Sequence, residues 1–205
     1  MNESVLAVNG LSVDILRQLS YPSALGLSLK KTLRHFDRER LLQEVQLMTE
    51  WLDEQTLLSE IALDYRIKSL ASAMQKIDRY VDSGRHTNQV LNDILGFRAF
   101  CDGYDEVLSM QSEIFSIADM SEGKADDDGY RGVHLYFQID NFHYPIEIQF
   151  NTLYDRQLNN WLHDYLYKKP IPNTVGKTMR MLYENGHIRN DKQFREALNN
   201  VLSGS

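Results

Sequence analysis

The sequence predicts an α+β protein in which helices flank a mixed sheet of about five strands. Residues 129–137 and 145–150 alternate apolar with polar side chains, as strands do when one sheet face is buried. The turn-type pair Asp140-Asn141 lies between these segments, which predicts two adjacent antiparallel strands. Stretches with helical spacing of apolar residues lie before and after this pair, and they supply the flanking helices.

The polar side chains of the two predicted strands are expected to meet on one face. Because alternate residues share a face, Glu147 and Gln149 lie together, and the neighbouring strand adds His134. Tyr130 and Arg131 precede that strand and are expected at the mouth of this face. A carboxylate, an amide and an imidazole gathered in this way indicate a site rather than a solvated surface.

The elements before this strand pair follow from periodicity and capping signals. Residues 12–55 are predicted to be helical, with an interruption near Pro22 and Gly26. Residues 57–67 fit a strand, although a helix is not excluded there. Ser69 is expected to cap a helix that runs to about Val81. The apolar run 94–101 is the next strand, followed by a helix over 104–115 and a short strand over 116–119.

The remaining segments complete one compact domain. Residues 121–129 lack apolar periodicity and predict a mobile acidic loop. Three helices are expected after the strand pair, over 153–167, 174–185 and 191–202. This organisation gives an N-terminal helical extension over 1–56, a central core over 57–170 and C-terminal helices over 171–205.

Composition excludes several classes of protein. No apolar run approaches the roughly 20 residues that span a bilayer, and no secretory signal is evident, so we expect a cytoplasmic protein without a membrane partner. The single cysteine, Cys101, excludes an intrachain disulfide and is expected to be a small core residue. A net charge of −7 argues against nonspecific nucleic-acid binding over the whole surface, but it leaves room for a local basic patch.

Five segments, in order, resemble the motifs of RelA/SpoT-type alarmone synthetases. Residues 66–76 resemble R-x-K-S-x-x-S-x-x-x-K, and residues 93–98 resemble D-x-x-G-x-R. Residues 129–135 are similar to G-Y-R-S-x-H-L, and residues 147–152 are similar to E-I-Q-I-R-T. A looser W…H…Y-K resemblance involves Trp161, His163, Tyr167 and Lys168. The order and spacing hold from about residue 65 to residue 169, half of the chain.

The resemblance implies a nucleotidyltransferase-like fold and a pyrophosphokinase activity. Members of the family transfer the β,γ-pyrophosphate of ATP to a ribose 3′-hydroxyl and release AMP. The chain is shorter than the members that also carry hydrolase and regulatory domains, so a small single-domain synthetase is expected.

The resemblance also assigns roles to individual residues. Asp93 and Glu147 would hold Mg²⁺, a hard cation that prefers carboxylate and phosphate oxygens, and Glu147 would also take the hydroxyl proton. Tyr130 would stack on the acceptor base and joins the two carboxylates as a catalytic candidate. The ATP-binding candidates are Arg66, Lys68, Ser72, Lys76 and Arg98, and the acceptor-binding candidates are Tyr130, Arg131, His134 and Gln149. Without the resemblance, these carboxylates fit solvated strand ends and His134 fits a structural role.

Two departures from the family pattern concern the acceptor. Asn151 stands where the family has Arg, and Gly132 stands where it has Ser. The loop before Tyr130 is acidic where guanosine-alarmone synthetases carry basic residues. A basic stripe on a helix is expected instead from residues spaced i, i+1, i+4, i+5 and i+8, namely Lys30, Lys31, Arg34, His35 and Arg38. This stripe fits an RNA phosphate backbone, although most such stripes are simply solvated helix faces.

These features are similar to those of the toxic FaRel-type branch of the family. That resemblance implies pyrophosphorylation of the tRNA acceptor (CCA) end, a block of aminoacylation and translation, and neutralisation by a cognate protein antitoxin. The tRNA-binding candidates are then Lys30, Lys31, Arg34 and Arg38. Two alternatives remain: a (p)ppGpp or (p)ppApp synthetase that uses free nucleotides, and a catalytically silent nucleotide-binding module. The sequence leaves open whether the chain forms a homo-oligomer.

Overall fold

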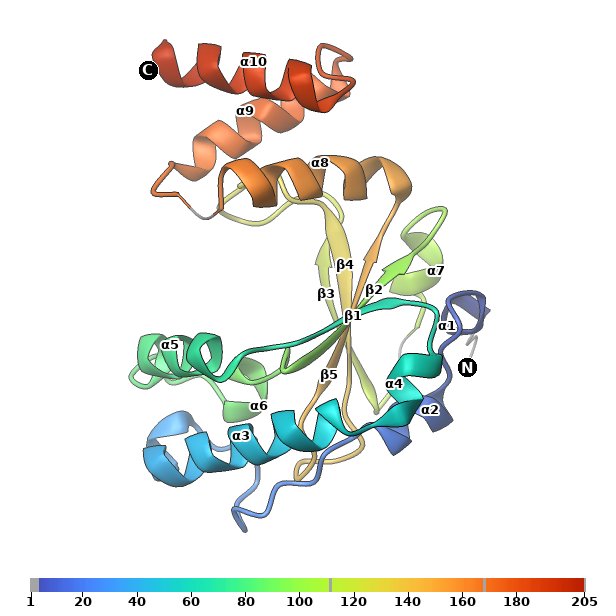
Figure 1. Ribbon diagram of the computed structural model, residues 1–205, viewed down its shortest axis with the longest axis vertical. Helices are drawn as coiled ribbons and strands as arrows, with labels where there is room; N and C mark the ends of the chain where they lie inside the picture. Colours follow the sequence, from blue (N-terminus) through green and yellow to red (C-terminus); the bar gives the residue numbers. More distant parts are fainter. Residues whose placement is uncertain (1–3, 111, 168, 205) are drawn as a thin grey trace. The chain divides into compact units, whose positions relative to one another are not determined.

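A computed structural model describes residues 4–110, 112–167 and 169–204. Lys168, part of the loose C-terminal resemblance, lies outside these residues. The described chain contains a five-stranded sheet with the strand order β1-β2-β5-β4-β3 (Figure 1). Its strands span Asp64–Ile67 (β1), Leu95–Phe100 (β2), Phe115–Met120 (β3), Gly132–Phe137 (β4) and Ile146–Asn151 (β5). The predicted α+β sheet of five strands is confirmed, and so is the adjacency of the strands now labelled β4 and β5.

Helices precede, separate and follow the strands along the chain. Before β2 they are α1 (Ser4–Val8), α2 (Val13–Gln18), the 3₁₀ turn η1 (Leu33–His35), α3 (Arg38–Asp53), α4 (Thr56–Glu60), α5 (Leu70–Tyr80) and α6 (Thr87–Val90). After β2 they are α7 (Asp105–Leu108), α8 (Leu153–Tyr165), α9 (Asn173–Glu184) and α10 (Asp191–Ser203). None of the helices in the described residues is long and apolar enough to cross a membrane.

The chain divides into two compact units with separate cores. Among the described residues, the first unit takes those within 1–99, 106–117 and 134–149, and the second takes those within 100–105, 118–133 and 150–205. In the first unit, α3 packs against α5 and β1. In the second unit, α9 packs against both α8 and α10 (Figure 1), and the core between these helices includes Leu158, Leu162, Met179 and Phe194. The sequence-based domain boundaries stay a prediction.

Side-chain caps mark the starts of two helices, one of which was predicted. The Ser69 side chain accepts a hydrogen bond from the backbone N–H of Ser72, so α5 begins at Leu70 as expected. The Thr152 side chain caps α8 by accepting from the N–H of Asp155. The segment 57–67 contains both a helix and a strand, the two structures that its sequence allows, because α4 ends at Glu60 and β1 begins at Asp64.

The helix predicted over 104–115 is wrong. Among the described residues of this range, only Asp105–Leu108 are helical, and β3 already begins at Phe115. Val107 within this turn and Met110 just after it are buried, so the local apolar residues are buried without a longer helix. Phe115 and Ile117 are apolar on either side of Ser116, a spacing that favours the start of a strand.

The continuous basic helix predicted over residues 30–38 is also wrong. Lys30 and Lys31 lie in a turn, and Thr32 forms a β-bridge with His86. Asp37 then starts α3 afresh, because its side chain accepts the N–H of Arg40 at 2.9 Å. Extended backbone at the bridge and at this cap interrupts any helix through the segment.

The basic residues of this segment differ in whether they form ion pairs. Lys30, Lys31 and Arg34 are exposed on the turn and on η1. Arg38 is the first residue of α3 and makes a bidentate pair with Asp78, with nitrogen–oxygen distances of 2.9 and 3.0 Å. The four tRNA-binding candidates therefore share a short exposed segment but do not form one helical stripe.

A buried carboxylate fastens the N-terminal segment to the first unit. Glu44 on α3 is 4% exposed and accepts hydrogen bonds from the Ser23 hydroxyl (2.7 Å), the Ala24 N–H (2.7 Å) and the Tyr144 hydroxyl (2.6 Å). Burial, and next the charge of Glu44, raise the pKa of Tyr144, so this hydroxyl keeps its proton and donates.

We expect Glu44→Ala to lower the free energy of unfolding by about 3 kcal/mol, because it leaves buried donors without an acceptor. Glu44→Gln keeps one acceptor oxygen and should cost less. The measurement is urea unfolding at neutral pH, with the exposed Glu50→Ala on the same helix as the control. A change for Glu44→Ala within about 0.5 kcal/mol of the control would show that this carboxylate does not anchor the segment.

Candidate active site

Glu147 is the centre of a polar cluster on β4 and β5. It is 5% exposed, and its Oε1 lies 3.0 Å from Nδ1 of His134 and accepts from the Tyr136 hydroxyl at 3.2 Å. The Gln149 amide donates to Oε2 at 2.6 Å. The structure thus brings together the three residues that strand alternation places on one face, His134, Glu147 and Gln149.

The surroundings of Glu147 favour its charged form. Burial would raise its pKa, but His134 and then Gln149 outweigh this and hold the pKa of Glu147 below its ordinary value. Asp93 acts in the opposite direction and raises the pKa through charge repulsion. Glu147 is therefore ionised at neutral pH, close enough to Asp93 for the two carboxylates to influence each other.

Gly96 on β2 lies directly against this carboxylate. A Cβ atom at this position would lie 3.3 Å from Oε2 of Glu147, tighter than most real contacts. A side chain at this position would therefore press against the Glu147 carboxylate. This is a physical reason for the glycine in the segment that runs from Asp93 to Arg98.

Asp93 is held by two lysines, one just before α5 and one in the middle of it. Lys68 Nζ lies 2.8 Å from Oδ2 of Asp93, and Lys76 Nζ lies 3.0 Å from Oδ1. Lys76 also donates to the side chain of Asn92 at 3.2 Å. Burial tends to raise the pKa of Asp93, but Lys76 and Lys68 together lower it below the ordinary value. Lys68 precedes the helix, so the two lysines meet through Asp93 rather than through one helix face.

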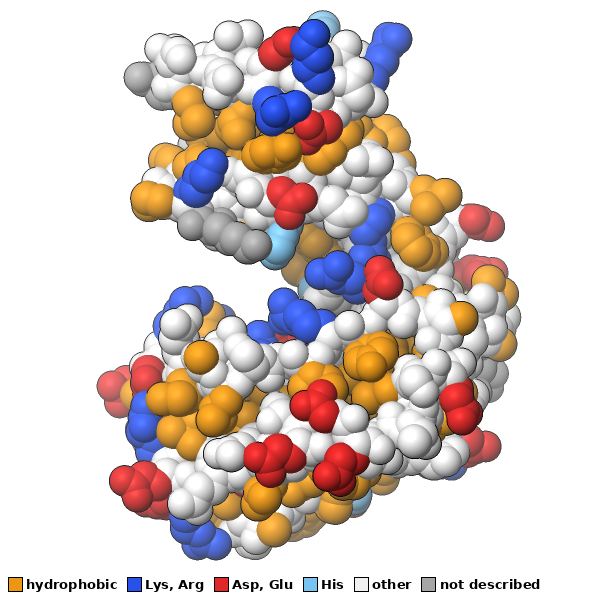
Figure 2. Space-filling view, viewed as in Figure 1, with side chains coloured by type: hydrophobic (Ala, Val, Ile, Leu, Met, Phe, Trp, Pro, Cys, Tyr) orange, Lys and Arg blue, Asp and Glu red, His pale blue; other side chains and the backbone are white. Residues whose placement is uncertain are grey.

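A pocket of about 290 Å³ opens beside this cluster in the first unit. It is lined by Lys68, Ser72, Gln75, Lys76, Arg79, Tyr80 and Asp93. Lys and Arg side chains gather over this part of the molecule, around α5 (Figure 2). Three basic residues around one small pocket suit the phosphates of a nucleotide. Sequence reasoning missed Gln75, Arg79 and Tyr80, although their i+3 and i+4 spacing from Ser72 and Lys76 was a usable signal.

Arg66 and Arg98 lie on the same side of the sheet as Glu147. In the antiparallel pairing of β1 and β2, Arg66 is opposite Gly96, and Arg98 follows two residues later on that face. The Cβ direction of Gly96 leads to Glu147, which fixes the common face. Both arginines are exposed, so their guanidinium groups are accessible to a ligand.

Tyr130 and Arg131 belong to the second unit, where the acidic loop surrounds them. Arg131 pairs with Asp127 at 2.8 Å. Lys124 pairs with Asp128 at 2.6 Å, and its ammonium lies 5.0 Å from the centre of the Tyr130 ring. The loop predicted as acidic therefore neutralises two of its carboxylates with its own neighbours.

The two departures from the family pattern touch each other in the second unit. Asn151 is 2% exposed and donates from Nδ2 to the carbonyl of Arg131 at 2.8 Å. A Cβ at Gly132 would lie 2.5 Å from this nitrogen and 2.7 Å from the Tyr130 hydroxyl. Gly132 is therefore needed for the packing of both Asn151 and Tyr130, and the two departures are one coupled feature.

Asp93 and Glu147 fit a magnesium site that is completed by ligands from outside the protein. Among the described residues, no group of three or more His, Cys, Asp or Glu side chains could hold a metal ion on its own. Mg²⁺ is commonly bound by one or two carboxylates together with substrate phosphates and water. Two carboxylates close enough to repel each other provide that donor set.

Comparison with known proteins identifies the family. The family model described as the region found in RelA / SpoT proteins matches residues 65–171, just over half of the chain. No curated protein matches.

Several solved structures resemble the chain at low sequence identity. Small alarmone synthetase 1 from Bacillus subtilis, bound to its product pppGpp, is 22% identical with a TM-score of 0.45, over 81% of this chain and 96% of that one. Small alarmone synthetase 2 from the same organism is 19% identical with a TM-score of 0.45, over 82% of this chain and 100% of that one. A GTP pyrophosphokinase family protein from Streptococcus pneumoniae is 20% identical with a TM-score of 0.40, over 78% of this chain and 83% of that one.

The family match contains most of the residues of this site. It begins at Tyr65, before Lys68, and extends past Glu147 to Ile171, so it covers both carboxylates and both lysines. The roles of the individual residues stay predictions, whereas the expectation of a pyrophosphokinase of this type is confirmed. The chain belongs to the RelA/SpoT family.

Proposed function

We propose that the chain transfers the β,γ-pyrophosphate of ATP to the 3′-hydroxyl of a tRNA acceptor end. In this reaction the 3′-oxygen attacks the β-phosphorus, the bond from that phosphorus to the oxygen of the α-phosphate breaks, and AMP leaves. The product carries the pyrophosphate in place of the hydroxyl proton, which blocks aminoacylation. The proposal includes the toxin role of the FaRel-type branch and a cognate protein antitoxin as partner.

The cluster of Asp93 with Lys68 and Lys76 is the observation that carries the transfer step. The two ammonium groups share one carboxylate beside a pocket lined by basic side chains, so the cluster keeps a net positive charge. When ATP binds, Lys68 and Lys76 can pair with its phosphates instead of with Asp93, which frees the oxygens of Asp93. Electrostatic stabilisation of the transferring group supplies most of the catalysis in such reactions.

Glu147 is the residue suited to accept the proton of the attacking hydroxyl. Its low pKa keeps it ionised, and the contacts from His134 and Tyr136 fix the orientation of Oε1. Together with Asp93 it would also hold Mg²⁺, which when bound neutralises charge on the transferring phosphates. Arg66 and Arg98, exposed on the same face, are suited to stack on the adenine or to pair with phosphate.

The RNA acceptor is supported by the exposed basic segment before α3. In this segment the salt bridge between described residues involves Arg38, not its basic neighbours. The side chains of Lys30, Lys31 and Arg34 are exposed on a turn and on η1. Such a segment suits a phosphate backbone, which needs accessible cations rather than a helix. A free nucleotide is the second candidate acceptor, and Lys124 beside the Tyr130 ring favours it, because a cation remains next to the proposed base-stacking residue.

We expect the double variant Lys30→Ala/Lys31→Ala to raise the KM for tRNA by about tenfold, through the loss of phosphate contacts. The dissociation constant for ATP should stay within about twofold, because the ATP pocket contains neither residue. Steady-state transfer to tRNA at two salt concentrations measures the effect. The matched control, Arg189→Ala/Lys192→Ala, removes the same charge from exposed positions around the start of α10. An unchanged KM would assign this segment to surface charge and favour the free nucleotide.

A further inference from the structure

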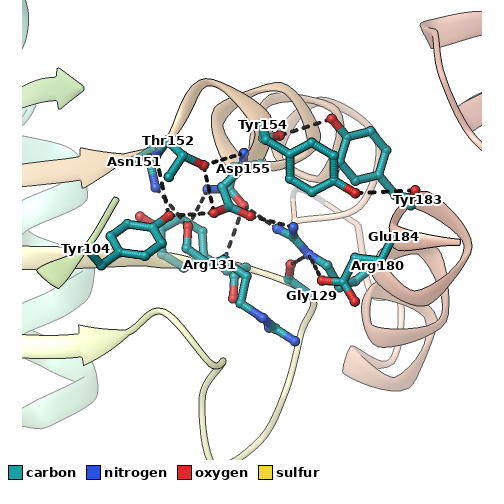
Figure 3. A network of polar contacts seen from close by, with 12 residues as sticks. Tyr104, Gly129, Arg131, Asn151, Thr152, Tyr154, Asp155, Arg180, Tyr183 and Glu184 are labelled. Atoms are coloured by element: carbon teal, nitrogen blue, oxygen red, sulfur yellow. Dashed lines mark hydrogen bonds and ion pairs between the residues drawn. The ribbon is translucent and has the colours of Figure 1, made fainter. Parts of the chain in front are cut away.

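The backbone on both sides of Tyr130 is held by side chains from later in the chain. The carbonyl of Gly129 accepts a hydrogen bond from Nε of Arg180 at 2.8 Å (Figure 3). On the other side, Arg131 donates its N–H to Oδ1 of Asn159 at 3.3 Å. The carbonyl of Arg131 accepts from Asn159 at 2.7 Å and from Asn151 at 2.8 Å. Both peptide groups that flank Tyr130 are thereby fixed.

Arg180 on α9 is itself held rigidly. It is 1% exposed, and its Nη1 lies 2.6 Å from Oδ1 of Asp155 (Figure 3). The other oxygen of Asp155 accepts from the hydroxyls of Tyr104 (2.6 Å) and Thr152 (2.9 Å). A buried guanidinium is tolerated only when its charge and its donors are paired, so this network fixes the fork of Arg180 in one orientation.

The backbone of α9 also approaches the same loop directly. Gly129 has a φ of 86°, and a Cβ there would overlap the carbonyl of Gly176 on α9. A Cβ at Gly176 would in turn overlap the carbonyl of Asp128. A glycine inside a helix costs about 1 kcal/mol relative to alanine. The two glycines are therefore explained by the close approach of loop and helix.

We propose that α9 positions the acceptor-binding segment 128–131, with Arg180 as the positioning residue. The inference rests on the role of Tyr130 proposed above. Arg180 and Gly176 lie beyond residue 171, where the family match ends. The hydrogen bond from Arg180 to the Gly129 carbonyl and the close contact of Gly176 with the loop then set where the Tyr130 ring can meet an acceptor base. The ATP pocket of the first unit does not depend on these two contacts.

The first test replaces Arg180 by Gln, which removes the charge and the fork but keeps a polar side chain. We expect the KM for the acceptor to rise about tenfold, because the variant loses about one hydrogen bond that involves a charged group. The dissociation constant for ATP should remain within about twofold. Amide exchange in segment 128–131 should become faster, while exchange in β5 residues 146–149 stays as in the wild type. Arg195→Gln on α10, whose partner Asp191 lies 3.0 Å away on the surface, is the matched control.

A second variant, Gly176→Ala, separates positioning from simple support of the helix. The added Cβ of alanine must displace the backbone of Asp128 in either case. If this contact has only a structural role, the displacement lowers the free energy of unfolding but leaves the acceptor KM unchanged. If α9 positions the loop, the added Cβ displaces Asp128, and the variant shows the same rise in acceptor KM and the same faster exchange as Arg180→Gln. An acceptor KM within twofold of wild type for both folded variants, with unchanged exchange in 128–131, would overturn the inference.

The exchange measurement keeps this inference distinct from the proposed function. If wild-type protein labels only a free nucleotide, the tRNA proposal fails, yet the two variants still test loop positioning through the KM for that nucleotide. If both variants label tRNA as the wild type does, the positioning role fails while the tRNA proposal stands.

Discussion

Glu147→Gln is expected to reduce pyrophosphate transfer by about a thousandfold, within the range that a lost catalytic base produces. The amide has the shape of the carboxylate, but it can neither take the hydroxyl proton nor provide a negative charge for Mg²⁺. Gln149 and Tyr136 still surround the side chain, so the fold should be retained. Single-turnover transfer from labelled ATP measures the effect.

The control for this variant is Glu60→Gln, which neutralises an exposed carboxylate at the end of α4. It should transfer pyrophosphate as the wild type does. Transfer by Glu147→Gln at more than about a tenth of the wild-type rate, in a protein with wild-type unfolding behaviour, would contradict the active-site assignment.

Asp93→Asn is expected to separate ATP binding from turnover. Removing the carboxylate frees Lys68 and Lys76 from their pairing, so ATP without metal should bind at least as tightly as to the wild type. Turnover with Mg²⁺ should fall by about a hundredfold or more, because one of the two metal carboxylates is lost. Equilibrium binding of ATP in a chelator and single-turnover transfer in Mg²⁺ provide the two readouts. Parallel losses of metal-free binding and turnover would contradict the proposed exchange of the lysines between Asp93 and phosphate.

The pH dependence of stability gives an independent check on Asp93. Its pKa in the folded protein lies below the unfolded value, so its stabilising contribution is present above about pH 4 and is lost as the pH falls through the folded pKa. Wild-type protein should therefore lose more of its unfolding free energy between pH 6 and pH 3 than Asp93→Asn, since asparagine does not titrate. An equal loss in both proteins would show that the lysines do not stabilise this carboxylate.

Local signals predicted much of the sheet and of its polar face. The strands β4 and β5 and the Ser69 cap depend on neighbouring residues alone, and all three are present in the structure, although β5 is buried on both faces. Asp93 and Glu147 could be named from motif resemblance. Their surroundings could not, because the pairing of Lys68 with Asp93 joins residues far apart in the sequence.

The N-terminal segment shows where spacing misleads. Basic residues at helical intervals predicted one stripe, but a tertiary bridge from Thr32 to His86 holds the chain extended there. Charges at such intervals fit a turn equally well, since they report exposure and not backbone conformation. Apolar anchors such as Leu33 and Phe36 were the better guide to this segment.

The network around Arg180 was missed although the sequence holds a signal for it. Val175, Met179 and Tyr183 mark the buried face of α9, and Arg180 occupies the same face. A charged residue on an apolar helix face needs a buried partner. The partner, Asp155, lies on another helix, so the sequence can raise this question without identifying the answer.

The most direct test of the proposed function follows the γ-phosphate of ATP. The protein receives γ-labelled ATP and Mg²⁺ with intact bulk tRNA, with tRNA whose 3′ end has been oxidised by periodate, or with GDP, GTP or ADP. We predict label on intact tRNA and none on the oxidised tRNA, which lacks the 3′-hydroxyl. Label on free nucleotides alone would contradict the account and make the chain an alarmone synthetase.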